Sequence, residues 1–124
     1  MAETITLPCR ADLASTARHA VRTLMSDAPK EVLDDAGLIV TEFMANSIRW
    51  SRSGLGGTVD IVVDYEPGAH TARLDVIDAG VLSKDHDLDP EQHGRGLQIV
   101  SHLAKLGHER SPHRQVWWAE LSWT

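Results

Sequence analysis

In the first half of the chain, apolar side chains recur at the spacing expected of one short strand and two helices. The strand is predicted at residues 3–9, and a first helix follows with Asp12 as its N-cap. A break at residues 26–29 ends this helix, and Pro29 suits the first turn of a second helix that runs to about Trp50. The apolar positions are Leu13, Ala17, Ala20, Val21 and Leu24 in the first helix and Leu33, Ala36, Val40, Phe43 and Met44 in the second.

The second half of the chain predicts four strands and one helix. Residues 58–66 and 71–78 alternate apolar and polar positions around the turn Pro67-Gly68. A last hairpin turns at Pro112-His113, and its second strand covers residues 115–123. A third helix lies between the hairpins; its marks are Leu97, Ile99, Val100, Leu103 and Leu106, with Gly107 at the C-terminal side.

The order strand-helix-helix-strand-strand-helix-strand-strand predicts an α+β fold. We expect a two-layer sandwich in which one mixed, mostly antiparallel sheet carries helices on one face. The length of 124 residues indicates a single domain over residues 1–124, which can bury roughly two-thirds of its unfolded surface. The other face of the sheet is then either exposed or an interface.

Charge and cysteine usage restrict the class of protein. The 18 acidic and 12 basic side chains give a net charge of −6, and no block of Lys and Arg is present to bind a phosphate backbone. The single cysteine, Cys9, cannot form an internal disulfide. Glu3 stands where a signal peptide would be basic, and no apolar stretch is long enough for a membrane helix. We therefore expect a cytoplasmic protein that contacts neither nucleic acid nor membrane directly.

Common nucleotide and metal motifs are incomplete in this chain. No G-x-x-x-x-G-K-[ST] sequence occurs, and Ile99 stands at the last glycine position of a dinucleotide fingerprint that begins at Gly94. Residues 85–89 space three aspartates like the first ligands of a calcium loop, but Pro90 and Gly96 replace its required Gly and Glu. The 7 histidines show no paired metal-ligand spacing, which favours solvated or core histidines.

Three short segments carry chemistry outside these motifs, and the first lies in the second helix. Glu42 and Asn46 are four residues apart, so both side chains project from one face. A carboxylate and an amide one turn apart can activate a hydroxyl group and hold a hydrated Mg²⁺ ion. A polar stripe that faces solvent is the alternative interpretation.

The second segment is Asp78-Ala79-Gly80, at the end of an apolar strand. A carboxylate in this position can accept a hydrogen bond from an exocyclic amine, and Gly80 lets the backbone approach a ligand. The alternative is an ordinary turn from strand to loop.

The third segment, His93-Gly94-Arg95-Gly96-Leu97, opens the third helix. Gly94 and Gly96 leave amide groups unshielded at a helix N-terminus, which favours an anion, and Arg95 could supply a further phosphate contact. A flexible hinge into the helix is the alternative.

In this order and spacing, the three segments resemble the N, G1 and G2 boxes of the GHKL superfamily of ATPases and kinases. More narrowly, the chain resembles the small bacterial anti-sigma regulatory factors that act as serine-protein kinases. The resemblance covers nearly the whole chain, through LIVTEFMANSIRWS, LDVIDAG, HGRGLQIVSHLAKLG and QVWWAEL. It implies the histidine-kinase-type ATPase fold, with ATP and Mg²⁺ as cofactors.

The resemblance also implies a role for each matching residue. Asn46 would be the Mg²⁺ ligand that links the metal to the nucleotide phosphates, and Glu42 would orient or deprotonate the attacking hydroxyl group. Asp78 would accept a hydrogen bond from the adenine amino group, and Gly80 would make room for the ring. The residues beside the phosphates, in the ATP lid, would be Gly94, Arg95 and Gly96.

The partners implied by the resemblance are a sigma factor in one state and, in another, an anti-sigma antagonist that is phosphorylated on serine. Leu82 replaces a second glycine of the G1 box, residues 81–92 form an acidic segment, and Gln115 stands where many relatives carry Thr. These departures motivate an alternative, a binding module that sequesters a sigma factor or antagonist without phosphoryl transfer. A third interpretation is the ATPase end of a histidine kinase, although the chain has no room for a phosphoacceptor helix pair.

The last strand carries a tryptophan cluster. Alternation sends Trp117 and Trp123 to one face of the sheet and Trp118 to the other. We expect Trp117 and Trp123 in the core. Trp118 on an exposed face would suit a homodimer, because aromatic side chains are enriched at interface centres.

Overall fold

Over the residues that the structure describes, the chain forms five strands and three α-helices in the predicted order. The structure is a computed structural model that describes residues 2–80 and 95–124. Its elements are β1 (Ala2–Pro8), α1 (Ala14–Leu24), α2 (Lys30–Trp50), β2 (Thr58–Glu66), β3 (Thr71–Asp78), α3 (Arg95–Leu103), β4 (Lys105–Arg110) and β5 (Gln115–Ser122). Among the described residues, no helix is both long and apolar enough to cross a bilayer.

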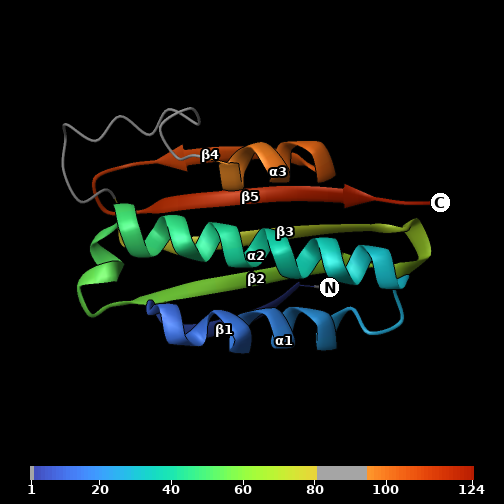
Figure 1. The fold of residues 1–124 in the computed structure, drawn as a ribbon, viewed down its shortest axis with the longest axis horizontal. Coiled ribbons are helices and arrows are strands. Elements are labelled where there is room, and N and C mark those ends of the chain that lie inside the picture. The colour runs from blue at the N-terminus through green and yellow to red at the C-terminus, as the bar shows by residue number, and fades with distance from the viewer. Residues whose placement is uncertain (1, 81–94) are drawn as a thin grey trace.

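The strands form one sheet in the order β1-β2-β3-β5-β4, and α1, α2 and α3 all lie on one face of it (Figure 1). The predicted α+β architecture with two layers is therefore confirmed. Every pair of neighbouring strands in this sheet is antiparallel, so the expected mixed sheet is wrong for the described strands. The reason is that β5 inserts between β3 and β4, which run in the same direction but do not touch.

The core lies between the helices and the inner face of the sheet. Trp117 of β5 is 1% exposed, and its ring stacks on Phe43 of α2 with 6.2 Å between ring centroids. Trp123 packs against the edge of this core, as predicted. Trp118 is half-buried on the other face, where the guanidinium of Arg73 lies 4.9 Å from its ring centroid.

The start of the first helix differs from the prediction. Asp12 lies inside a 3₁₀ turn, Ala11–Leu13, and its carboxylate accepts a hydrogen bond from the Arg10 side chain at 3.1 Å. Leu13 is the N-cap of α1 and has no side chain that can cap. The predicted N-cap is wrong because the Arg10 ion pair uses the carboxylate that would have capped the helix.

The end of the third helix also differs, since Leu106 and Gly107 lie in β4. Leu106 pairs with Ala119 of β5, and Gly107 pairs with Trp118 of the same strand. A Cβ atom at Gly107 would collide with the Trp118 indole. This glycine therefore allows a close contact within the sheet and does not end a helix. Helical spacing alone predicts too late an end for the third helix, because it contains no information on the pairing of Leu106 and Gly107 with β5.

Candidate functional site

Asp78 lies at the end of β3, with 5% of its surface exposed. Its Oδ2 accepts hydrogen bonds from Ser47 Oγ at 2.7 Å and Gln115 Nε2 at 2.9 Å, and its Oδ1 accepts one from the Gly80 N–H at 2.9 Å. Burial raises the pKa of Asp78, whereas the hydrogen bonds from Gln115 and Ser47 act in the opposite direction. These three donors are all neutral, and no cation within residues 2–80 and 96–124 pairs with the carboxylate.

The turn after Asp78 is hydrogen-bonded to the 3₁₀ turn Arg52–Leu55, which follows α2. The Ala79 N–H donates to Ser53 Oγ at 2.9 Å, and the Gly80 carbonyl accepts from the Arg52 N–H at 3.0 Å. Gly80 has φ +99°, and a Cβ atom there would lie 2.5 Å from the Pro112 carbonyl oxygen. The backbone therefore requires glycine at this position for its own packing. That Gly80 also makes room for a ligand ring stays a prediction.

Asn46 lies one residue before Ser47 on α2 and is only 7% exposed. Its side-chain amide has no hydrogen-bond partner among residues 2–80 and 96–124. This burial contradicts the alternative interpretation, in which Asn46 belongs to a polar stripe that faces solvent. The Asn46 amide atoms are not among the fully enclosed polar atoms that lack a partner, and the side-chain oxygen is a ligand type that Mg²⁺ accepts. The residue therefore fits the role of a metal ligand.

The described part of the chain contains no cluster of three or more His, Cys, Asp or Glu side chains that could hold a metal ion. At phosphoryl-transfer sites Mg²⁺ usually takes one or two protein ligands and completes its coordination with nucleotide phosphates and water.

Glu42 lies one helical turn before Asn46 and is half-buried. A Cβ atom at Gly96 would collide with its carboxylate, so the glycine allows the first turn of α3 to pack directly against α2. Two segments that the sequence separates by more than fifty positions are therefore in contact. The N-terminal end of a helix carries partial positive charge, which favours the Glu42 carboxylate and a phosphate group alike.

Of the rest of the predicted lid, the structure describes only the backbone of Arg95. Arg95 begins α3, but nothing is described of its side chain, and Gly94 precedes the described segment. Leu82 and the acidic residues of 81–92 fall in the same stretch. The phosphate-binding roles assigned to Gly94 and Arg95 therefore stay predictions.

Two further polar residues, Gln115 and His108, extend the Asp78 network and were not assigned a positive role from the sequence. Gln115 is fully buried, and its Oε1 lies 2.7 Å from Nε2 of His108. The His108 ring stacks on Trp117 with 3.9 Å between ring centroids. The pairing of Asp78 with Gln115 follows from the register of β3 and β5. No local sequence signal contains this register. Ser47, in contrast, directly follows Asn46 in the sequence, and this position is a local signal for a further polar residue of the site.

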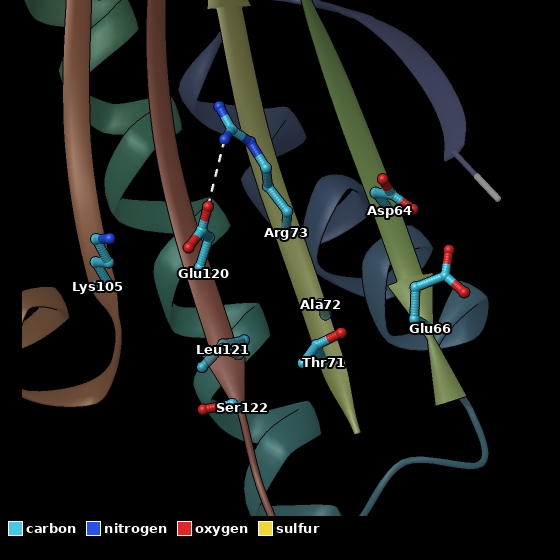
Figure 2. Close-up of a pocket in the computed structure, with 9 residues that line it drawn as sticks. All are labelled: Asp64, Glu66, Thr71, Ala72, Arg73, Lys105, Glu120, Leu121 and Ser122. Atoms are coloured by element: carbon cyan, nitrogen blue, oxygen red, sulfur yellow. Dashed lines mark hydrogen bonds and ion pairs between the residues drawn. The ribbon is translucent and has the colours of Figure 1, made fainter. Parts of the chain in front are cut away.

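A separate groove of about 420 Å³ lies on the face of the sheet opposite the helices (Figure 2). It contains none of the predicted site residues. Its lining includes Asp64, Glu66 and the ion pair of Arg73 with Glu120, whose charged atoms are 3.4 Å apart. With three carboxylates against the two cations Arg73 and Lys105, the lining gives nucleotide phosphates no net attraction, so the groove is a poor candidate for the nucleotide site.

Comparison with known families agrees with this arrangement. The family described as histidine kinase-like ATPase domain matches residues 7–116, a segment that contains Glu42, Asn46, Asp78 and Gln115. No curated protein matches the chain. The match covers far more than half of the sequence and confirms the resemblance to GHKL ATPases, and the chain belongs to the histidine kinase-like ATPase domain family.

Proposed function

We propose that the chain binds ATP with Mg²⁺ and transfers the γ-phosphoryl group to a serine of a partner protein, as an anti-sigma regulatory factor. One observation carries this proposal: α2 presents Glu42, Asn46 and Ser47 along one stretch, next to both Asp78 and the start of α3. A nucleotide has its base at one end and its phosphates at the other. A single helix that borders an acceptor for the base and a helix N-terminus for the phosphates suits such a ligand.

Recognition of adenine depends on Asp78. The ionised carboxylate can only accept hydrogen bonds, and the 6-amino group of adenine can donate one. Its three protein donors fix the orientation of the carboxylate without neutralising its charge. Asp78 therefore offers a fixed acceptor for an amine.

The phosphate end of the site depends on Asn46 and Gly96. The Asn46 side-chain oxygen would hold Mg²⁺, and the free amide groups in the first turn of α3 would bind phosphate oxygens. The metal, when bound, neutralises negative charge on the phosphates. Positioning and charge neutralisation account for most of the catalysis in phosphoryl transfer, so few protein groups are required.

Glu42 would act as the base. The oxygen of the partner's serine forms a bond to the γ-phosphorus, and the bond from that phosphorus to the bridging oxygen breaks, which releases ADP. The hydroxyl proton passes to the Glu42 carboxylate. The implied partners are a sigma factor, bound in one state, and an anti-sigma antagonist that supplies the serine in the other.

Calorimetric titration of ATP and ADP, with and without Mg²⁺, tests the binding half of this proposal. We expect binding that depends on Mg²⁺ and falls at least about tenfold in Asn46→Ala, since a metal-bridging contact is lost. Arg49→Ala is the matched control, because Arg49 is an exposed residue of the same helix. The absence of binding by the folded wild-type protein would overturn the proposal and favour the binding module that sequesters its partner without catalysis.

The transfer half is tested with Glu42→Gln and a radiolabelled nucleotide. This variant should bind ATP like the wild type but lose labelling of a serine antagonist by about a hundredfold or more, because the amide cannot accept the proton. Labelling at the wild-type rate would remove Glu42 from the mechanism.

A further inference from the structure

His108 lies on β4 and belongs to none of the three nucleotide-binding segments. Its Nε2 atom is 2.7 Å from Oε1 of Gln115, and Nε2 of Gln115 is 2.9 Å from Oδ2 of Asp78. A continuous line of hydrogen bonds therefore runs from the edge strand of the sheet to the acceptor that we assign to adenine.

The direction of these hydrogen bonds follows from the chemistry of the three groups. An ionised carboxylate only accepts, so the Gln115 amino group must face Asp78 and the Gln115 carbonyl oxygen must face His108. His108 must then carry its proton on Nε2 in order to donate. The imidazole is held in this position by stacking on Trp117 with 21° between the ring planes.

The orientation of the Gln115 amide is the property that His108 controls. Gln115 is fully buried, so water is not available to replace a missing donor at Oε1. Without the His108 donor, a half-turn of the amide would direct Oε1 toward Asp78. That arrangement requires a proton on the carboxyl group, and burial already raises the pKa of Asp78 and so reduces the cost of adding that proton.

We propose that His108 is a positioning residue which, through Gln115, keeps Asp78 an acceptor and thereby sets the preference for 6-aminopurine over 6-oxopurine nucleotides. A 6-amino group donates a hydrogen bond to an ionised carboxylate, whereas a 6-oxo group accepts and is favoured only by a protonated one. This inference rests on the proposed nucleotide site. It adds a residue on β4, beyond the three segments, to the determinants of base specificity.

The test compares the affinities for ATP and inosine triphosphate, both with Mg²⁺, in wild type and two variants. His108→Phe keeps the stacked ring and removes the donor, whereas His108→Gln places an amide donor at a similar distance. We expect the preference for ATP to fall about tenfold in His108→Phe, as for the loss of one hydrogen bond, and to be restored in His108→Gln. His19→Phe is the matched control, because His19 is an exposed residue of α1. A wild-type preference in folded His108→Phe would overturn the proposal.

A second measurement needs neither a variant nor a nucleotide. A long-range ¹H–¹⁵N spectrum of the wild-type protein reports which imidazole nitrogen of His108 carries the proton, and we expect Nε2. A neutral ring with the proton on Nδ1 alone would overturn the inference. Because this readout is independent of ATP, it separates failure of the His108 role from failure of the proposed nucleotide site.

Discussion

Two carboxylates of β3 lie three residues apart but on opposite faces of the sheet, and their surroundings differ in kind. Asp75, on the outer face, pairs with Arg73 at 2.9 Å, and Arg73 also reaches Glu120. Asp78, on the inner face, is held by Ser47 and Gln115 through neutral donors. The first carboxylate is paired with a permanent cation, whereas the second has no cation beside it among the described residues.

This difference separates a carboxylate with a structural role from one that can serve a ligand. An ion pair on the outer face is screened by water and contributes little to stability, but it costs little as well. A buried carboxylate without a cation reduces stability, and perturbed carboxylates of this kind cluster at functional sites. The same strand therefore carries one carboxylate that is paired with a cation and one that is held by neutral donors.

The largest expected effect comes from Asp78→Asn. The oxygen of the neutral side chain can still accept from Gln115 and Ser47, but its amino group then faces the Gly80 N–H and loses that hydrogen bond. We expect ATP affinity to fall by about a hundredfold or more, because the fixed, charged acceptor is lost, while the free energy of unfolding at neutral pH changes by at most about 1 kcal/mol, since removal of the buried charge offsets the lost hydrogen bond. Calorimetry with ATP and urea denaturation of the same preparations check both parts.

The pH dependence of stability tests whether the buried charge of Asp78 lowers the free energy of unfolding. Because the pKa of Asp78 is raised in the folded state, that state binds more protons than the unfolded chain in the window above the ordinary value of 3.8. The wild type should therefore lose stability relative to Asp78→Asn as the pH rises through this window, and the difference should then stay constant. A wild-type protein that becomes more stable than the variant with rising pH would contradict the proposed difference between the two carboxylates.

A smaller effect is expected on the outer face, from Arg73→Met. This variant keeps an apolar stem over Trp118 but removes the charge that pairs with Asp75 and Glu120. We expect a loss of at most about 1 kcal/mol in the free energy of unfolding, smaller at high salt, because these groups are partly exposed. ATP binding should be unchanged. A loss of ATP affinity comparable to that of Asp78→Asn would show that the two faces are not independent.

The smallest effect concerns a third carboxylate, Asp27, which also has a neutral donor but is exposed. It accepts a hydrogen bond from the Tyr65 hydroxyl at 2.6 Å, and this bond raises the pKa of Tyr65 to about 12. The stability that it adds is present below the ordinary tyrosine pKa of 10.0 and is lost as the pH rises toward 12. In Asp27→Asn we expect the pKa to fall toward 10.0. Tyr65 is the only tyrosine, so an absorbance titration follows it directly.

The fold was largely predictable because its information is local. The strands at residues 58–66 and 71–78 have the predicted bounds, and α2 ends at Trp50 as its periodicity indicates. The predictions of an N-cap at Asp12 and of the end of α3 were wrong, because contacts that the apolar pattern does not contain determine both features. Arg10 forms an ion pair with the Asp12 carboxylate, and Leu106 pairs with β5 as part of a strand.

The candidate site was predictable only in part. Local motifs were sufficient to single out Asn46 and Asp78. The partners that hold Asp78 could not be inferred in the same way, because Gln115 and His108 become its neighbours only when β5 inserts between β3 and β4. The spacing of residues along the sequence does not indicate this insertion.

The pairing of β1 with β2 has a consequence for how the chain folds. Leu7 and Val59 are partners in this pair although α1 and α2 lie between them in the sequence, whereas the β2–β3 and β4–β5 hairpins close over a few residues. The entropy of closing the long loop is compensated only once the two helices have packed. We therefore expect β1 to dock late in folding. Until then, the free edge of β2 exposes unpaired backbone groups to other chains and is the point at which aggregation would begin.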